Sequence, residues 1–79
     1  MANKQKIIEI YTLNCNYFEK QFKEEICDVW IKILGSCNYN DKMIEDCFND
    51  HIQDSSKPIM LNDFKSFRDN NYFKYGYEG

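Results

Sequence analysis

The sequence has 79 residues, of which 43% are hydrophobic, and it carries a formal net charge of −3. This length allows one domain around one hydrophobic core, and the acidic balance argues against direct binding of duplex DNA, which depends on Lys and Arg side chains that neutralise phosphates. No apolar run approaches the length of a membrane span, and Glu9 interrupts any signal-peptide-like segment, so we expect a cytosolic protein, that is, one of the cytoplasmic compartment.

The first half of the chain predicts two helices. Apolar residues recur at helical spacing over residues 7–18, which predicts a helix at about 4–15 followed by a loosely wound connection. A second and clearer apolar stripe predicts an amphipathic helix that ends at Gly35 and turns its apolar face to the core, with Trp30 at the centre. The members of this stripe are Phe22, Ile26, Val29, Trp30, Ile33, Leu34 and Cys37.

The second half predicts two more helices. Asn40 and its neighbours have turn and capping chemistry, and the apolar stripe of residues 43–52 predicts a helix after them. The opposite face of that helix is acidic, with Lys42 as its one base. Its carboxylates belong to Asp41, Glu45, Asp46, Asp50 and Asp54. Pro58 then disfavours helix in the residue before it and precedes a short fourth helix that ends near residues 68–70.

Residues 1–70 are therefore predicted to form a single helical domain, with residues 71–79 as an aromatic tail. The tail carries Tyr72, Phe73, Tyr75 and Tyr77. Either it folds back onto the core or it contacts a partner or a second copy of the chain. Short connections between helices favour antiparallel packing, and no alternating pattern predicts a strand pair. The predicted fold is all-α, a small antiparallel bundle of about four helices with a short aromatic tail.

Residue types that commonly carry catalysis or bind metals form no recognisable pattern. The three glycines are scattered, so no phosphate-binding loop is predicted, and no carboxylate falls within an apolar stripe where burial could tune its pKa. Cys47 and His51 lie one helical turn apart and could form half of a metal site, but no second close pair completes it. We expect a non-enzymatic protein without cofactor or metal, whose cysteines are reduced thiols that pack as small hydrophobic residues.

The order of these features resembles the N-terminal domain of phage replicative-helicase loaders, the loader-and-inhibitor family of phages of low-GC Gram-positive bacteria. Trp30 and Leu34 match the W-x-x-x-L helix of that family, and Tyr39 matches its aromatic turn. Residues 58–64 are similar to the P-P-T-hydrophobic-x-E-hydrophobic stretch that opens the last helix. The similarity covers about residues 7–67.

The resemblance implies a function without catalysis, in which the protein holds a replicative helicase inactive and delivers it to an origin-bound initiator. The chain departs from the family at Ile59 and Met60, which stand where the family has its second Pro and its capping Thr. From the residues themselves, we predict that the acidic helix face and the tail aromatics bind the partner. These candidate partner-binding residues are Asp41, Glu45, Asp46, Asp50, Asp54, Tyr72, Phe73, Tyr75 and Tyr77.

Two other functions also fit the sequence. A phage inhibitor of a host nucleic-acid-handling complex, such as an anti-CRISPR protein, would use the acidic face to imitate a phosphate backbone. Binding by such charge mimicry weakens steeply as the salt concentration rises, whereas binding through aromatic anchors depends on salt less. The third possibility is a homodimeric structural protein whose tails pair the subunits.

Overall fold

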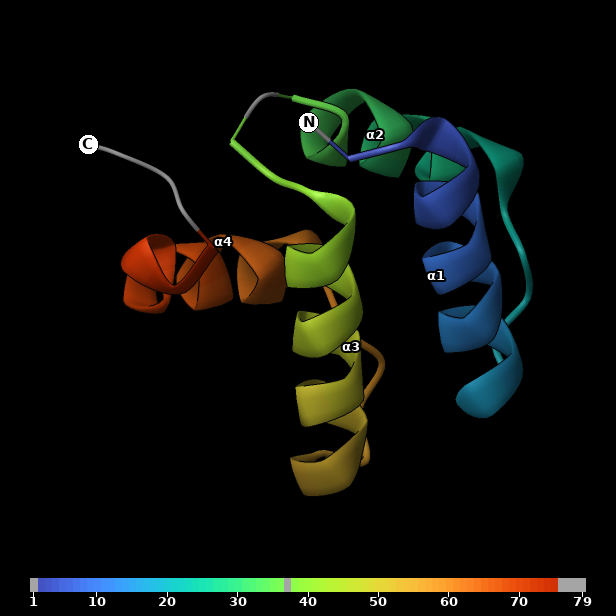
Figure 1. The fold of residues 1–79 in the computed structure, drawn as a ribbon. Coiled ribbons are helices and arrows are strands. Elements are labelled where there is room, and N and C mark those ends of the chain that lie inside the picture. The colour runs from blue at the N-terminus through green and yellow to red at the C-terminus, as the bar shows by residue number, and fades with distance from the viewer. Residues whose placement is uncertain (1, 37, 76–79) are drawn as a thin grey trace.

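The computed structural model describes residues 2–36 and 38–75 and shows four α-helices and a short 3-10 helix in them (Figure 1). The elements are α1 (Lys4–Tyr17), α2 (Glu24–Leu34), α3 (Asp41–Asp54), α4 (Leu61–Asn70) and η1 (Tyr72–Tyr75). The described residues contain no strand, and no helix among them is long and apolar enough to cross a membrane. The all-α prediction with four helices is confirmed.

Helix α1 continues two residues beyond its predicted end because its last turn closes in a regular capping motif. Glu19 adopts the left-handed region with φ 56°, and the N–H of Lys20 donates to the carbonyl oxygen of Cys15 at 2.8 Å. This backbone bond satisfies a carbonyl that the helix end would otherwise leave without a partner. The predicted loose winding after residue 15 is therefore replaced by helix up to Tyr17.

The starts of α3 and α4 follow the local sequence. The side chain of Asn40 accepts a hydrogen bond from the N–H of Met43 at 2.8 Å, which confirms the predicted N-cap. Met60 precedes α4 and has no side-chain acceptor for this role, but the carboxylate of Asp63 accepts from the N–H of Met60 at 2.8 Å. Helix α4 thus keeps the reciprocal half of a capping box.

Helices α1 and α3 lie side by side and parallel, and α2 lies crosswise near their N-terminal ends (Figure 1). The N-termini of α1 and α3 meet where the N–H of Asn3 donates to Asp41 at 2.6 Å. Near the C-termini of the same two helices, the ring of Phe18 lies 6.3 Å from that of His51. Helix α2 crosses α1 and runs back toward its beginning, and α4 packs across α3. The hydrophobic core lies between these helices.

Three aromatic rings form the centre of the core. The ring of Trp30 contacts Tyr11 and Phe64 edge to face, at centroid distances of 5.0 and 5.2 Å, and its side chain is 4% exposed. The predicted central position of Trp30 is confirmed. Cys15, Cys27 and Cys47 are buried free thiols, whereas Cys37 lies outside the described residues.

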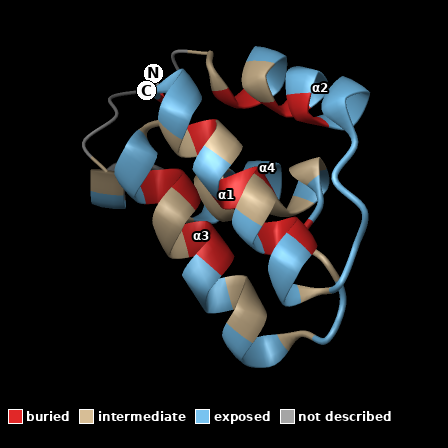
Figure 2. Cartoon of the chain, turned by 90° about the vertical axis from the view of Figure 1, so that its right-hand side faces the viewer, coloured by how far each residue is buried: buried red, intermediate tan, exposed pale blue. Residues whose placement is uncertain are grey.

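The prediction that the whole apolar stripe of α2 is buried is wrong. The residues of α2 that face the core are Cys27, Trp30 and Leu34. The residues left at the surface are Phe22, Ile26, Val29 and Ile33, which are 46%, 39%, 47% and 42% exposed. Helix α2 carries an apolar arc wider than the area that α1 and α4 cover, and Figure 2 shows its exposed outer side beside the buried inner one.

Candidate protein-binding surfaces

The first candidate surface is the apolar stripe, by which we mean Ile26, Val29 and Ile33 on the exposed side of α2 together with Phe22, which precedes the helix and whose ring lies 4.9 Å from that of Tyr11. The three members within α2 follow each other at intervals of three and four residues, so they form one row along the helix. Met60, which is 62% exposed, adds a fifth large apolar side chain nearby. Contiguous exposed apolar side chains mark interaction surfaces more often than isolated ones do.

A hollow of about 310 Å³ lies beside the apolar stripe and extends it toward α4. Ile26, Val29 and the edge of Trp30 line one wall, and residues 59–62 line the other. The lining is mainly apolar, with Lys20 at the rim. A hollow of this kind suits a bulky side chain of a partner, because binding anchors are generally large side chains in desolvated pockets.

The second wall of this hollow is held in place by Asn14, the one buried polar residue among those described. Its side-chain amide donates to the carbonyl oxygen of Ile59 at 3.3 Å, and its carbonyl oxygen accepts from the N–H of Ile59 at 3.0 Å. The apolar spacing that predicted this helix gives Asn14 no role. The signal that could have found its role is an amide-bearing side chain in register with Ile7 and Ile10 on the buried face of the helix.

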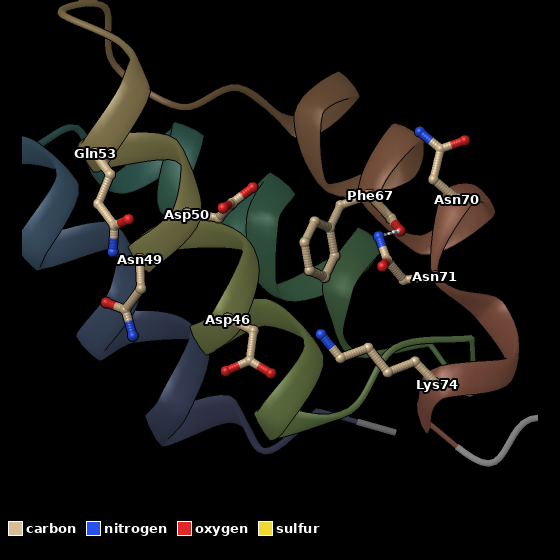
Figure 3. A pocket seen from close by; sticks show the side chains of 8 residues that line it. All are labelled: Asp46, Asn49, Asp50, Gln53, Phe67, Asn70, Asn71 and Lys74. Carbon is tan, nitrogen blue, oxygen red and sulfur yellow. Dashed lines mark hydrogen bonds between the residues drawn. The ribbon is translucent and has the colours of Figure 1, made fainter.

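A second, polar hollow of about 530 Å³ separates α3 from the end of α4 (Figure 3). Asp46 and Asp50 face it from α3, and Lys74 extends across it from the opposite side. The side chain of Asn71 is tied to the carbonyl oxygen of Phe67 at 2.9 Å. This hollow brings two of the predicted acidic residues next to the beginning of the predicted tail.

The predicted acidic face is divided between the two sides of α3. On the side of α1, Asp41 accepts a hydrogen bond from the backbone N–H of Asn3, and Glu45 forms an ion pair with Lys6. The hydrogen bond to Glu45 is the main cause that raises the pKa of Lys6 above its ordinary value. These two carboxylates therefore join α3 to α1.

On the side of α4, Asp46 forms an ion pair with Lys42 at 3.0 Å and accepts a hydrogen bond from the hydroxyl of Tyr75 at 2.9 Å. Asp50 and Asp54 are exposed and form no ion pair with any residue in the described ranges. Three of the five predicted carboxylates thus have intramolecular partners, and two face solvent.

The tail folds back onto the core at Tyr75, which is one of the two alternatives predicted for it. The ring of Tyr75 is half-buried and lies 6.0 Å from that of Phe67, in addition to its bond with Asp46. Tyr72 and Phe73 belong to η1, but their side chains, and Tyr77 as a whole, lie outside the described residues. A binding role for those three stays a prediction.

The bond between Tyr75 and Asp46 predicts a specific pH dependence of stability. Burial, and then the bond to Asp46, raise the pKa of Tyr75 to about 12, while the bonds from Lys42 and then Tyr75 lower the pKa of Asp46. A raised Tyr pKa contributes stability that is complete below the ordinary value of about 10 and is lost as the pH rises through about 12. A lowered Asp pKa contributes stability above about 3.8 that is lost in more acidic solution.

We expect Tyr75→Phe to reduce the free energy of unfolding by about 1 kcal/mol at neutral pH, because the variant lacks the hydroxyl donor. This deficit should shrink as the pH rises from 10 toward 12, where the wild-type hydroxyl also loses its proton. Urea denaturation followed by circular dichroism at pH 7 to 11 measures both effects. Tyr17→Phe, at an exposed tyrosine, is the control, and a deficit that does not change with pH would contradict the assignment.

Cys47 and His51 do not converge on a common point. The thiol of Cys47 donates to the carbonyl oxygen of Asp63 at 3.6 Å, and burial raises its pKa to about 12. The Nε2 of His51 donates to the carbonyl oxygen of Lys57 at 2.7 Å. Within the part of the chain that the structure describes, no three His, Cys, Asp or Glu side chains lie close enough to hold a metal ion.

Comparisons with protein-family models, with curated proteins and with solved structures found no match to this chain. The resemblance to helicase loaders therefore depends on its motif residues alone. Of these, Trp30, Leu34 and Tyr39 are buried, so the matched motifs describe packing in the core and leave the binding surface to be argued from other residues.

Proposed function

We propose that this chain is a non-enzymatic protein-binding module that binds a replicative helicase through the apolar stripe of α2. The observation that carries the proposal is the exposure of Ile26, Val29 and Ile33, which form one row on α2 and are 39%, 47% and 42% exposed, with Phe22 exposed just before the helix. Burial of apolar surface contributes about 25 cal/mol per Å², so covering this row with a partner would favour binding. The nature of the partner comes from the resemblance to helicase loaders.

The surroundings of the apolar stripe also suit a protein partner. The adjacent hollow of about 310 Å³ can receive one large side chain, and charged residues of α2 such as Glu25 and Lys32 form a polar rim. An apolar centre with a polar rim is the usual composition of a binding surface. By comparison, the predicted acidic face is divided, and most of its carboxylates already have intramolecular partners.

An inhibitor of a nucleic-acid-handling complex is the second candidate function, and the exposure of Asp50 and Asp54 favours it. Both carboxylates face solvent, and Asp50 stands at the rim of the polar hollow beside Asp46. A basic groove could accept these charges in place of phosphates. This second function requires that the affinity for the partner fall steeply as the salt concentration rises.

Binding to a purified hexameric replicative helicase from a low-GC Gram-positive bacterium tests both functions. We expect Val29→Asp to weaken binding by about 30-fold or more, since a charge in the middle of the apolar stripe would be buried without a partner. We expect the double variant Asp50→Lys/Asp54→Lys to change the affinity by less than about threefold, because a charge outside the contact acts only weakly. Isothermal titration calorimetry at low and high salt measures these affinities.

The outcomes separate the candidates. Asn49→Asp places the same new charge on the exposed side of α3 and is the control for Val29→Asp. Loss of binding in the Lys variant together with a steep salt dependence would favour the charge-mimicking inhibitor. If the wild-type chain does not bind the helicase, the assignment of the partner is wrong.

A further inference from the structure

The apolar stripe has the spacing that one helix needs to pack along another. Its members within α2, Ile26, Val29 and Ile33, follow each other at intervals of three and four residues, which average 3.5, the repeat at which apolar side chains stay on the seam between two helices. Phe22 precedes the helix, where it is 46% exposed and its ring contacts that of Tyr11. An α-helix is therefore the shape that fits this row best.

Charged side chains beside the seam indicate which kind of helix would pack on it. Glu25 and Lys32 are exposed and lie seven residues apart on the side of the seam that Val29 borders, about 10 Å apart along the helix axis. Neither forms an ion pair with another residue of the described part of the chain. One edge of the seam thus carries a negative charge near its beginning and a positive charge near its end.

We propose that a second copy of this chain packs antiparallel on the apolar stripe, with Glu25 of each copy opposite Lys32 of the other. A twofold axis across the seam brings the same edge of both helices together and reverses one of them. The reversal places the acid of one copy beside the base of the other, twice in each dimer. The edge is therefore complementary to itself, and a second copy satisfies both charges at once.

The size of the surface makes this dimer weak and reversible. Helix α2 has 11 residues and is about 16 Å long, so even with Phe22 and Met60 it offers less than the roughly 800 Å² per partner of a standard interface. We expect dissociation in the micromolar range. Since the dimer covers the stripe, self-association would compete with the helicase, and this consequence, unlike the dimer itself, rests on the proposed function.

Sedimentation equilibrium on the full chain, from roughly 1 µM to 1 mM and at low salt, tests the proposal. We expect a monomer–dimer equilibrium for the wild type. Glu25→Lys and Lys32→Glu should each weaken the dimer by about tenfold, because each places like charges opposite each other at two positions. The double variant Glu25→Lys/Lys32→Glu restores opposite charges and should return the dissociation constant to within about threefold of the wild type.

Asp28→Lys is the matched control, since it makes the same change from acid to base on the same helix but away from the seam. It should leave the dimer unchanged. All these charged positions are exposed, so circular dichroism should show the same helical content in each variant. A wild type that stays monomeric at every concentration, or a double variant that fails to recover, would overturn the proposal.

These measurements use no helicase, so they fail or succeed independently of the proposed function. A monomeric chain that still loses helicase binding on Val29→Asp would refute the dimer and support the module. A dimer that recovers in the double variant but binds no helicase would support this inference and refute the assigned partner.

Discussion

Trp30→Ala is expected to lower the free energy of unfolding by about 3–5 kcal/mol, the usual loss when a large buried aromatic side chain is truncated. The indole is 4% exposed and contacts the rings of Tyr11 and Phe64 edge to face, so its removal opens a cavity where α1, α2 and α4 meet. A folded domain is commonly stable by only about 5–15 kcal/mol, and this small chain belongs near the lower limit. The variant should therefore be partly unfolded at room temperature.

Urea denaturation followed by circular dichroism measures this loss, and the neighbouring residue supplies the control. Val29→Ala removes apolar atoms from the same helix, but Val29 is 47% exposed, so we expect a change of less than about 1 kcal/mol. A similar loss in both variants would mean that α2 is rotated relative to the structure. A loss below about 1 kcal/mol for Trp30→Ala would exclude it from the core.

The contrast between these neighbours shows how far periodicity can predict the fold. The buried set of α2 and the exposed set have the same internal spacing, and one is displaced from the other by a single residue. Both sets are apolar, so the sequence predicts an amphipathic helix correctly but cannot decide how much of its arc other helices cover. That coverage depends on the positions of α1 and α4, which are set by contacts distant in sequence.

The prediction of the acidic face lacked the same information, namely which helices pack beside α3. Its five carboxylates were correctly placed on one helix outside the apolar stripe, but the sequence does not show that α1 and α4 flank that helix on both sides. The partner of Glu45 is Lys6, and that of Asp46 is Tyr75, 29 residues away. Local spacing can predict the pair of Lys42 and Asp46 one turn apart, but neither of these long-range contacts.

Helix ends were predicted best, because local chemistry determines them. Asn40 caps α3 as expected, α2 ends just before Gly35, and the residues around Pro58 form the connection to α4. Asn14 is the exception, since an Asn in a helix commonly weakens it. Here its side chain is used for a long-range contact with Ile59, 45 residues away, which no local rule anticipates.

We expect Asn14→Ala to reduce the free energy of unfolding by about 2–4 kcal/mol, because it leaves both backbone polar groups of a buried residue without a partner. Ile59 is 2% exposed, so water cannot replace the amide without opening the structure. Asn16→Ala changes the same residue type in the same helix at an exposed position and should differ from the wild type by less than about 0.5 kcal/mol. Chemical denaturation of the pair isolates the contact.

The same substitution should also act on the binding surface, because Asn14 holds the wall of the hollow beside the apolar stripe. Loss of the two bonds lets residues 59–62 move, and the amide hydrogen of Ile59 should exchange with solvent faster than those of α3. Hydrogen exchange measured by NMR tests this under conditions where the variant is still mostly folded. Faster exchange throughout the chain would indicate global destabilisation only, whereas faster exchange confined to residues 59–62 would show that Asn14 positions one wall of the proposed binding site.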